Sequence, residues 1–185
     1  MMPKNYTNCS ECPFNYTQKE KSKISANAMK TLELPLEKED NGSEVLLVFE
    51  APGFFEWRNR KPVFDSRDDG MNNSAGAMFA KALENNNKLR DSYDITEAVQ
   101  CFPGSQAKKK QTEVDLASLY CITNLYNDLI NPNYKKIVCF GEVASRSIRV
   151  ITQIYPFSGK VIELLHPSAK ENNQEKLDHD VRNNL

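Results

Sequence analysis

The chain has 185 residues, of which 39% are hydrophobic and 26% charged, so a single domain over residues 1–185 with one core is expected. The net charge of −1 argues against a generic DNA-coating protein, which would be strongly basic. No apolar run approaches the length of a membrane span, and the N-terminus lacks the apolar stretch of a signal peptide. A monomeric cytoplasmic protein without a membrane partner is expected.

The first convincing strand follows a polar segment, residues 18–42, which separates it from a cysteine pair at Cys9 and Cys12. Residues 45–49 form a continuous apolar run, the pattern of a strand buried on both faces. The run leads into Ala51-Pro52-Gly53, where proline and glycine end the strand and force a tight loop.

Two helices and a second strand are expected next. Ser74 is placed to cap a helix over residues 75–83, and residues 93–99 have the character of a strand. Thr112 is expected to cap a long amphipathic helix over residues 113–129. The apolar face predicted for this helix consists of Val114, Leu116, Leu119, Ile122, Leu125 and Leu129.

The remaining elements complete an alternating pattern. Residues 137–140 predict a third strand with Cys139 in its core, residues 142–153 a helix, and residues 161–165 a fourth strand. The tail over residues 170–185 is rich in asparagine and charge and is expected to lie on the surface. Alternation of strands and helices predicts an α/β fold with three layers, in which a central, mostly parallel four-stranded sheet has helices on both faces.

Three residues with ionisable side chains lie at or near the carboxyl ends of predicted strands: Glu50, Glu97 and His166. In an α/β sheet the ligand crevice lies outside these ends. The three side chains are therefore expected to share one site.

Four cysteines suggest a metal centre. Cys9 and Cys12 have the spacing of a metal-binding pair, whereas Cys101 and Cys121 must be brought together by folding. Four thiolates suit either zinc or an iron–sulfur cluster, and the spacing does not separate these. The alternative is that Cys101 and Cys121 are small buried residues.

The order of motifs resembles the iron–sulfur (family 4) branch of the uracil-DNA glycosylase superfamily. The resemblance extends from Cys9 to about Ser168 and includes Phe49-Glu50-Ala51-Pro52-Gly53 and His166-Pro167-Ser168. It implies a DNA glycosylase in which two loops close on a nucleotide flipped out of DNA. It also implies a structural [4Fe-4S] cluster on Cys9, Cys12, Cys101 and Cys121, with zinc as the alternative metal.

The resemblance also assigns roles to the site residues. Glu50 and Glu56 correspond to the carboxylates beside the sugar, and His166 to the donor that stabilises the leaving base anion. An aromatic ring is expected to stack on the base, and Phe64 is favoured over its neighbour Val63 for this role.

The base pocket is expected between the Ala51-Pro52-Gly53 turn, Glu97 and His166. Members of the family commonly have asparagine where this chain has Glu97. An ionised carboxylate only accepts hydrogen bonds, so it would disfavour uracil and favour a base with an exocyclic amine. The longer stretch over residues 65–73 further suggests a reshaped pocket and a modified base.

DNA contacts are expected on both sides of these loops. The segment over residues 168–172 would enter the minor groove, with Ser168 at its start and Lys170 near a phosphate. The basic run Lys108-Lys109-Lys110 flanks the proposed site and is expected to contact phosphate.

The sequence thus predicts a DNA N-glycosylase that removes a flipped pyrimidine and leaves an abasic site. The base is uracil by family default, or a cytosine-type or modified base, such as one from phage DNA, by the chemistry of Glu97. Two alternatives remain open: a non-catalytic DNA-binding module of the same fold, and a zinc-stapled protein with unrelated chemistry.

Overall fold

The computed structural model describes residues 35–102, 111–130 and 134–185. Cys9, Cys12 and the lysine run at residues 108–110 lie outside the described residues. No helix in the described part of the chain is both long and apolar enough to cross a membrane.

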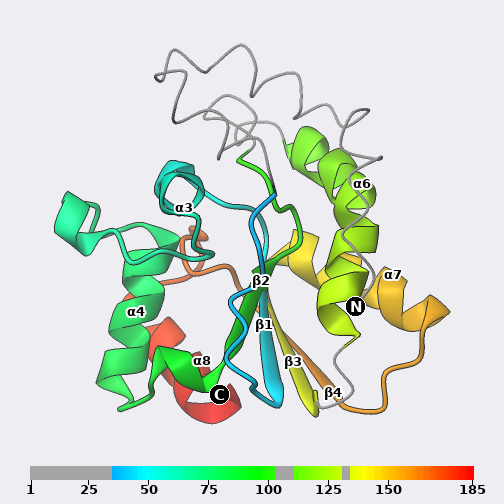
Figure 1. The fold of residues 1–185 in the computed structure, drawn as a ribbon. Helices are drawn as coiled ribbons and strands as arrows, with labels where there is room; N and C mark the ends of the chain where they lie inside the picture. Colours follow the sequence, from blue (N-terminus) through cyan, green and yellow to red (C-terminus); the bar gives the residue numbers. More distant parts are fainter. Residues whose placement is uncertain (1–34, 103–110, 131–133) are drawn as a thin grey trace.

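The centre of the molecule is a four-stranded sheet in the order β2-β1-β3-β4, and every neighbouring pair is parallel (Figure 1). The strands are β1 (Val45–Phe49), β2 (Asp94–Glu97), β3 (Lys136–Phe140) and β4 (Lys160–Leu164). The predicted parallel α/β sheet is confirmed, with small shifts at the ends of β2, β3 and β4.

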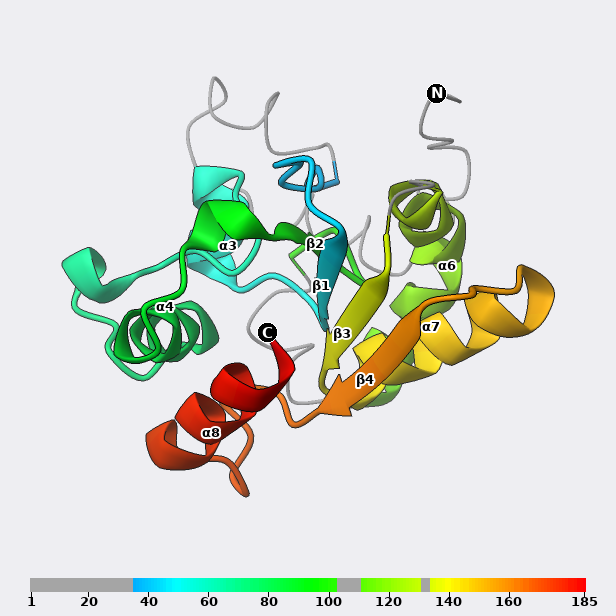
Figure 2. The same cartoon turned by 90° about the horizontal axis from the view of Figure 1, so that it is seen from below.

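Helices cover both faces of this sheet. They are α3 (Phe54–Asn59), α4 (Ala75–Asn85), α6 (Gln111–Leu129), α7 (Glu142–Ile154) and α8 (Gln174–Asn184), with short 3₁₀ turns at Arg67–Asp69 and Arg90–Ser92. Figure 2 shows α6 and α7 on one face and α4 and α8 on the other. Ser74 caps α4 as predicted, because its hydroxyl accepts the Ala77 N–H at 3.1 Å.

The alternating side chains of β1 divide the core into two clusters. Leu46 and Val48 pack on the side of α6 and α7, and Leu47 and Phe49 on the side of α4 and α8. Cys139 of β3 is fully buried in the first cluster, and burial raises the pKa of its thiol to about 12. Cys139 is a core strand residue, as expected from its position in an apolar run.

The C-terminal segment is not the surface tail that the sequence predicts. It forms α8, whose Leu177 and Val181 are fully buried in the second cluster. The Asn173 side chain caps the helix by accepting the Lys176 N–H at 2.8 Å. Two apolar residues spaced i, i+4 are enough to dock a helix whose other residues are mostly polar.

In helix α6 (Gln111–Leu129) most of the predicted apolar face turns inward: Val114 and Leu125 are buried, and Ile122 and Leu129 pack against the first cluster. Leu116 and Leu119, both predicted in the apolar face, are 45% and 59% exposed. The buried face also includes small or polar residues: Ala117, Ser118, Cys121, Asn124 and Asp128. Asp128 is satisfied there because it accepts hydrogen bonds from the Thr96 hydroxyl (2.7 Å) and the Gln100 amide (2.6 Å).

A second buried carboxylate anchors the amino end of β2. Asp94 is fully buried and accepts backbone N–H groups from Asn41 (2.8 Å) and Ser43 (3.1 Å), the Tyr134 hydroxyl, and the Lys38 ammonium at 3.4 Å. Burial alone would raise the pKa of Asp94, but these donors outweigh burial and lower it.

Candidate active site

The carboxyl edge of the sheet gathers the predicted site residues. Glu50 follows β1, Glu97 ends β2, and His166 comes two residues after β4. Because all four strands are parallel, these three positions lie at the same edge of the sheet.

A hollow of about 330 Å³ opens at this edge, and it is called the main pocket below. Its volume lies at the lower end of the range for small-molecule sites. It is lined by Phe49, Ala51, Gly53, Phe54, Phe55, Glu56, Val63, Met71, Asn73, Ser74, Ala75, Glu97, Phe102, His166 and Ser168. The structure therefore brings together Ala51, Glu56, Glu97, His166 and Ser168 from the predicted set.

Glu97 faces the main pocket although it is almost completely buried, with 2% of its surface exposed. Its Oε1 accepts the backbone N–H of Val63 at 3.1 Å. The preceding residue, Thr96, points to the opposite face of the sheet and binds Asp128. Strand alternation thus directs the carboxylate into the crevice, as the predicted specificity role requires.

The segment that donates to Glu97 has a strained backbone. Val63 has φ of 46°, a left-handed conformation that is a genuine outlier for a β-branched residue. Arg90 holds this segment from the other side: its guanidinium donates to the carbonyl oxygens of Pro62 (2.5 Å) and Val63 (3.0 Å) while it pairs with Glu39. Contacts on both sides therefore fix the strained turn.

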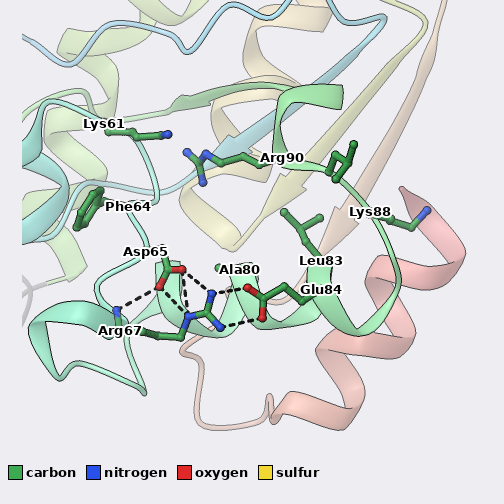
Figure 3. A pocket seen from close by; sticks show the side chains of 10 residues that line it. Lys61, Phe64, Asp65, Arg67, Ala80, Leu83, Glu84, Lys88 and Arg90 are labelled. Carbon is green, nitrogen blue, oxygen red and sulfur yellow. Dashed lines mark hydrogen bonds and ion pairs between the residues drawn. The ribbon is translucent and has the colours of Figure 1, made fainter.

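The left-handed turn decides which residue reaches the main pocket. Val63 lines it, whereas Phe64 lines a second hollow on the other side of the segment (Figure 3). Phe64, predicted as the stacking residue, is therefore not among the residues that line the main pocket, and Val63 occupies its wall. The Phe64 backbone is fixed by Gly76, where an added Cβ would come within 1.9 Å of the Phe64 carbonyl oxygen.

Aromatic rings nevertheless line the main pocket. Phe54 and Phe55 begin α3, with ring centroids 5.7 Å apart, and Phe102 lies 6.0 Å from Phe54. None of these three rings was predicted as a site residue, although Phe54 and Phe55 directly follow the Pro-Gly turn and Phe102 directly follows Cys101. Their positions beside two predicted motifs were the available signal.

Glu50 is directed toward the N-terminus of α7. Its Oε1 accepts the Val143 N–H at 3.1 Å, in the first turn of α7, and it is not among the pocket-lining residues. A helix N-terminus stabilises a negative charge placed there. Gly141 permits this approach, because an added Cβ would come within 2.3 Å of the carboxylate and its φ is +100°.

Glu56 is the second predicted acid, and it is buried. It lies on α3, is 7% exposed, and lines the main pocket. Two carboxylates, Glu56 and Glu97, therefore line the same hollow as His166.

His166 is oriented by the residues that follow it. Its Nδ1 lies 3.0 Å from the Ser168 hydroxyl and 3.4 Å from the Ser168 backbone N–H. Because a backbone N–H only donates, this geometry favours Nδ1 as an acceptor and a proton on Nε2. The carbonyl of His166 accepts from Ala169 (2.9 Å) and Asn172 (3.1 Å), so the turn that carries the ring is itself hydrogen-bonded.

The stretch over residues 65–73 forms one wall of the pocket through Met71 and Asn73. Arg67 ties it to α4 by forked hydrogen bonds of 2.6–2.8 Å to Glu84. The hydroxyls of Ser66 and Ser74 lie 2.6 Å apart at its base. The longer loop is therefore anchored to the helix that supports the pocket.

The described half of the predicted cluster site lies close to the sheet. Cys121 is 4% exposed and packs in the same cluster as Val99. Val99 precedes the half-buried Cys101 by two residues in the sequence. Two thiols suit a soft metal or a cluster. Among the described residues there is no group of three or more His, Cys, Asp or Glu side chains that could hold a metal ion.

Of the predicted phosphate contacts, Lys170 is exposed on the turn after His166, near the mouth formed in part by Ser168. The lysine run at residues 108–110 falls outside the described residues.

Comparison with known proteins agrees with this architecture. The family model described as the uracil DNA glycosylase superfamily matches residues 37–184. No curated protein matches the chain. Members of this superfamily are DNA glycosylases, which hydrolyse the bond between a base and its sugar. The match spans most of the chain and the whole sheet with its site, so the protein belongs to the uracil DNA glycosylase superfamily.

Proposed function

We propose that this protein is a DNA glycosylase that holds a flipped pyrimidine in the main pocket and hydrolyses its N-glycosidic bond. The observation that carries the proposal is the convergence of His166, Glu56 and Glu97 on one hollow of about 330 Å³ at the carboxyl edge of the sheet. Water adds to the sugar carbon, the carbon–nitrogen bond breaks, and the base leaves with the bonding electrons. The product is an abasic site.

His166 acts on the leaving base. A proton on Nε2 would donate to the base carbonyl oxygen, where negative charge develops as the bond breaks. The Ser168 N–H at 3.4 Å from Nδ1 supports this tautomer. Protein donors that are aligned in advance need no reorganisation at the moment of reaction.

The carboxylates act on the sugar and the water. Glu56 lines the main pocket and would orient the attacking water. Glu50, held at the N-terminus of α7 by the Val143 N–H, would stabilise the positive charge on the sugar through space. We therefore expect Glu56→Gln to lower turnover more than Glu50→Gln, since only Glu56 would contact the water directly.

Glu97 selects the base. Its carboxylate is directed into the pocket and accepts hydrogen bonds when it is ionised. It would repel the O4 atom of uracil and accept from an exocyclic amine, so we propose a cytosine-type or modified pyrimidine as the preferred base. Uracil is the default for the superfamily and is the base to which preference should revert when the carboxylate is removed.

A strand-scission assay tests both levels of this proposal. Oligonucleotides carrying uracil, hypoxanthine, cytosine or a C5-substituted cytosine are incubated with the wild type, with Glu97→Asn and with the exposed control variant Glu37→Asn. Polar mismatch in a pocket can discriminate by up to ~10⁴-fold. We expect Glu97→Asn to raise uracil excision relative to any cytosine derivative, and the control to behave as wild type.

Two outcomes contradict the proposal at different levels. If the wild type removes uracil as fast as Glu97→Asn does, the role of Glu97 fails and plain uracil excision remains. If the wild type cleaves none of these substrates yet binds DNA, the protein is a non-catalytic binding module of the same fold.

The cysteines would hold a [4Fe-4S] cluster that braces the fold, with Cys9 and Cys12 completing the site begun by Cys101 and Cys121. The buried Cys121 beside Val99 supports this. Such a cluster would be structural, since hydrolysis transfers no electrons. Elemental analysis of aerobically purified protein should find iron, and Cys121→Ser should lose it together with stability. Zinc in its place would identify the alternative metal.

A further inference from the structure

The second hollow has a volume of about 290 Å³ and lies across residues 62–64 from the main pocket. Figure 3 shows Phe64 and Lys61 on one side of it, Leu83 and Lys88 on the other, and Arg90 between them. Its lining is Lys61, Phe64, Asp65, Arg67, Ala80, Leu83, Glu84, Lys88, Leu89 and Arg90. Four of these side chains are cationic and two are anionic.

The two acids of the second hollow are already engaged. Arg67 donates to Asp65 at 2.6–3.1 Å and to Glu84 at 2.6 and 2.8 Å. Hydrogen bonds from Arg67 lower the pKa of both carboxyls. Both acids are therefore ionised at neutral pH and directed at Arg67, which reduces their repulsion of an anion in the hollow.

The four cationic side chains differ in the number of ion pairs and hydrogen bonds that they make. Arg67 is held by two carboxylates, and Arg90 by Glu39 and two backbone carbonyls. Within the described residues the only ion pair of Lys61 is a long contact of 3.8 Å to Glu39, and 46% of its side chain is exposed. Lys88 is half-buried and makes no ion pair within the described part of the chain. Lys61 and Lys88 are thus the cations available to a ligand.

The apolar part of the lining offers a flat surface. The Phe64 ring is half-buried, and Ala80, Leu83 and Leu89 contribute aliphatic area, with Leu89 67% exposed. An aromatic ring beside lysines is the combination that binds a nucleobase by stacking and its phosphate by charge.

We propose that the second hollow is a nucleotide-binding subsite, in which a base stacks on Phe64 and the phosphate is held by Lys61 or Lys88. The nucleotide is either free in solution or part of a DNA strand. The site is separate from the main pocket, because Phe64 faces the second hollow while Val63 faces the other.

Binding measurements test the subsite on the full chain. Deoxycytidine monophosphate and a short single-stranded oligodeoxycytidylate are titrated by calorimetry, and the backbone amide signals are followed by NMR. We expect signals from Phe64, Leu83 and Leu89 to shift. Phe64→Leu keeps an apolar side chain but removes the ring and should weaken binding by about tenfold.

Lys61→Gln and Lys88→Gln are made singly and together, and the double variant should reduce the slope of log affinity against log salt by about 1. The matched controls are Tyr155→Leu, an exposed ring on the other side of the sheet, and Lys176→Gln on α8, and both should bind as wild type. A stronger response to the oligonucleotide than to the mononucleotide identifies a DNA strand as the source, and the reverse identifies a free nucleotide.

The proposal is overturned if Phe64→Leu and the Lys61→Gln, Lys88→Gln double variant both bind as wild type, or if the shifted signals are confined to the surroundings of Glu97 and His166. Thermal melting of each variant checks that it is folded, and the lysine double variant tests the site even if Phe64→Leu unfolds. Because the readout is binding and not excision, the result is independent of whether the main pocket is catalytic.

Discussion

Strand β2 carries two buried acids, Asp94 at its amino end and Glu97 at its carboxyl end. The surroundings of the two carboxylates differ. Asp94 is surrounded by donors from Asn41, Ser43, Tyr134 and Lys38 and has no pocket beside it among the hollows described above. Glu97 accepts from Val63 but faces a hollow of about 330 Å³. The position of each acid in the sheet thus supports a structural role for Asp94 and the functional role that we propose for Glu97.

The largest expected effect is at the amino edge. Asp94→Ala should lower the free energy of unfolding by about 3–5 kcal/mol, because it removes from a buried site the carboxylate that accepts the Asn41 and Ser43 N–H groups and the Tyr134 hydroxyl. Urea unfolding measures this loss. The exposed Asp40, which also contacts Lys38 (3.3 Å), is the matched control, and Asp40→Ala should change stability by less than about 0.5 kcal/mol. A mild Asp94→Ala variant would refute the structural assignment.

At the carboxyl edge the loss should appear in turnover. His166→Ala should lower single-turnover excision by about 10²- to 10³-fold, since it removes a donor to the leaving base. DNA binding and unfolding free energy should change much less. His179→Ala, at the only other histidine of the chain, is the control and should excise at the wild-type rate. Full activity in His166→Ala would remove the ring from the mechanism.

Gly141→Ala should lower both the stability of the protein and its turnover. The added Cβ would displace the Glu50 side chain, and the φ of +100° is strained for alanine. We expect a loss of about 1–3 kcal/mol in stability and of up to about 10²-fold in turnover.

Gly42→Ala separates the effect of backbone strain from the effect of displacing Glu50. Gly42 also has a positive φ, +71°, but open space around it. It should cost only the backbone strain, about 1–2 kcal/mol, and leave excision unchanged. Equal activity in the two variants would show that displacing Glu50 has no chemical consequence.

The smallest effect concerns pH. The pKa of Asp94 is lowered in the folded protein, because its hydrogen-bond donors outweigh burial, which acts in the opposite direction. A lowered pKa stabilises the fold above the unfolded value of about 3.9, and this contribution is lost as the pH falls through the folded value. Urea titrations from neutral pH down to pH ~3 should therefore show a steeper loss of stability for wild type than for Asp94→Asn. Parallel curves would contradict the assignment.

The parts of the fold that sequence predicts are those set by local pattern. The apolar runs of β1 and β3 identify buried strands without knowledge of their partners, and Ser74 identifies the start of α4. Helix α8 was missed because only Leu177 and Val181 bury it, and their partners come from other parts of the chain. Local pattern carries no record of such long-range packing.

The site also has features that the sequence predicts and features that it does not. Alternation within β2 directs Glu97 into the pocket, and that orientation could be predicted. That Val63 and not Phe64 lines the main pocket could not be predicted. This placement depends on the left-handed conformation of Val63, which contacts with Arg90 and Glu97 and the close packing of Gly76 stabilise. Two residues adjacent in sequence then face two different hollows.

The contact between Gly76 and Phe64 also limits how the protein can be re-engineered. Any side chain at residue 76 would push on the Phe64 carbonyl, so the first turn of α4 and the segment that divides the two hollows must change together. Met71 and Asn73 lie on an exposed loop at the rim and do not face that constraint. A library that aims to accept larger bases should therefore vary the rim and keep Gly76 fixed, because new specificities are reached there without rebuilding the dividing wall.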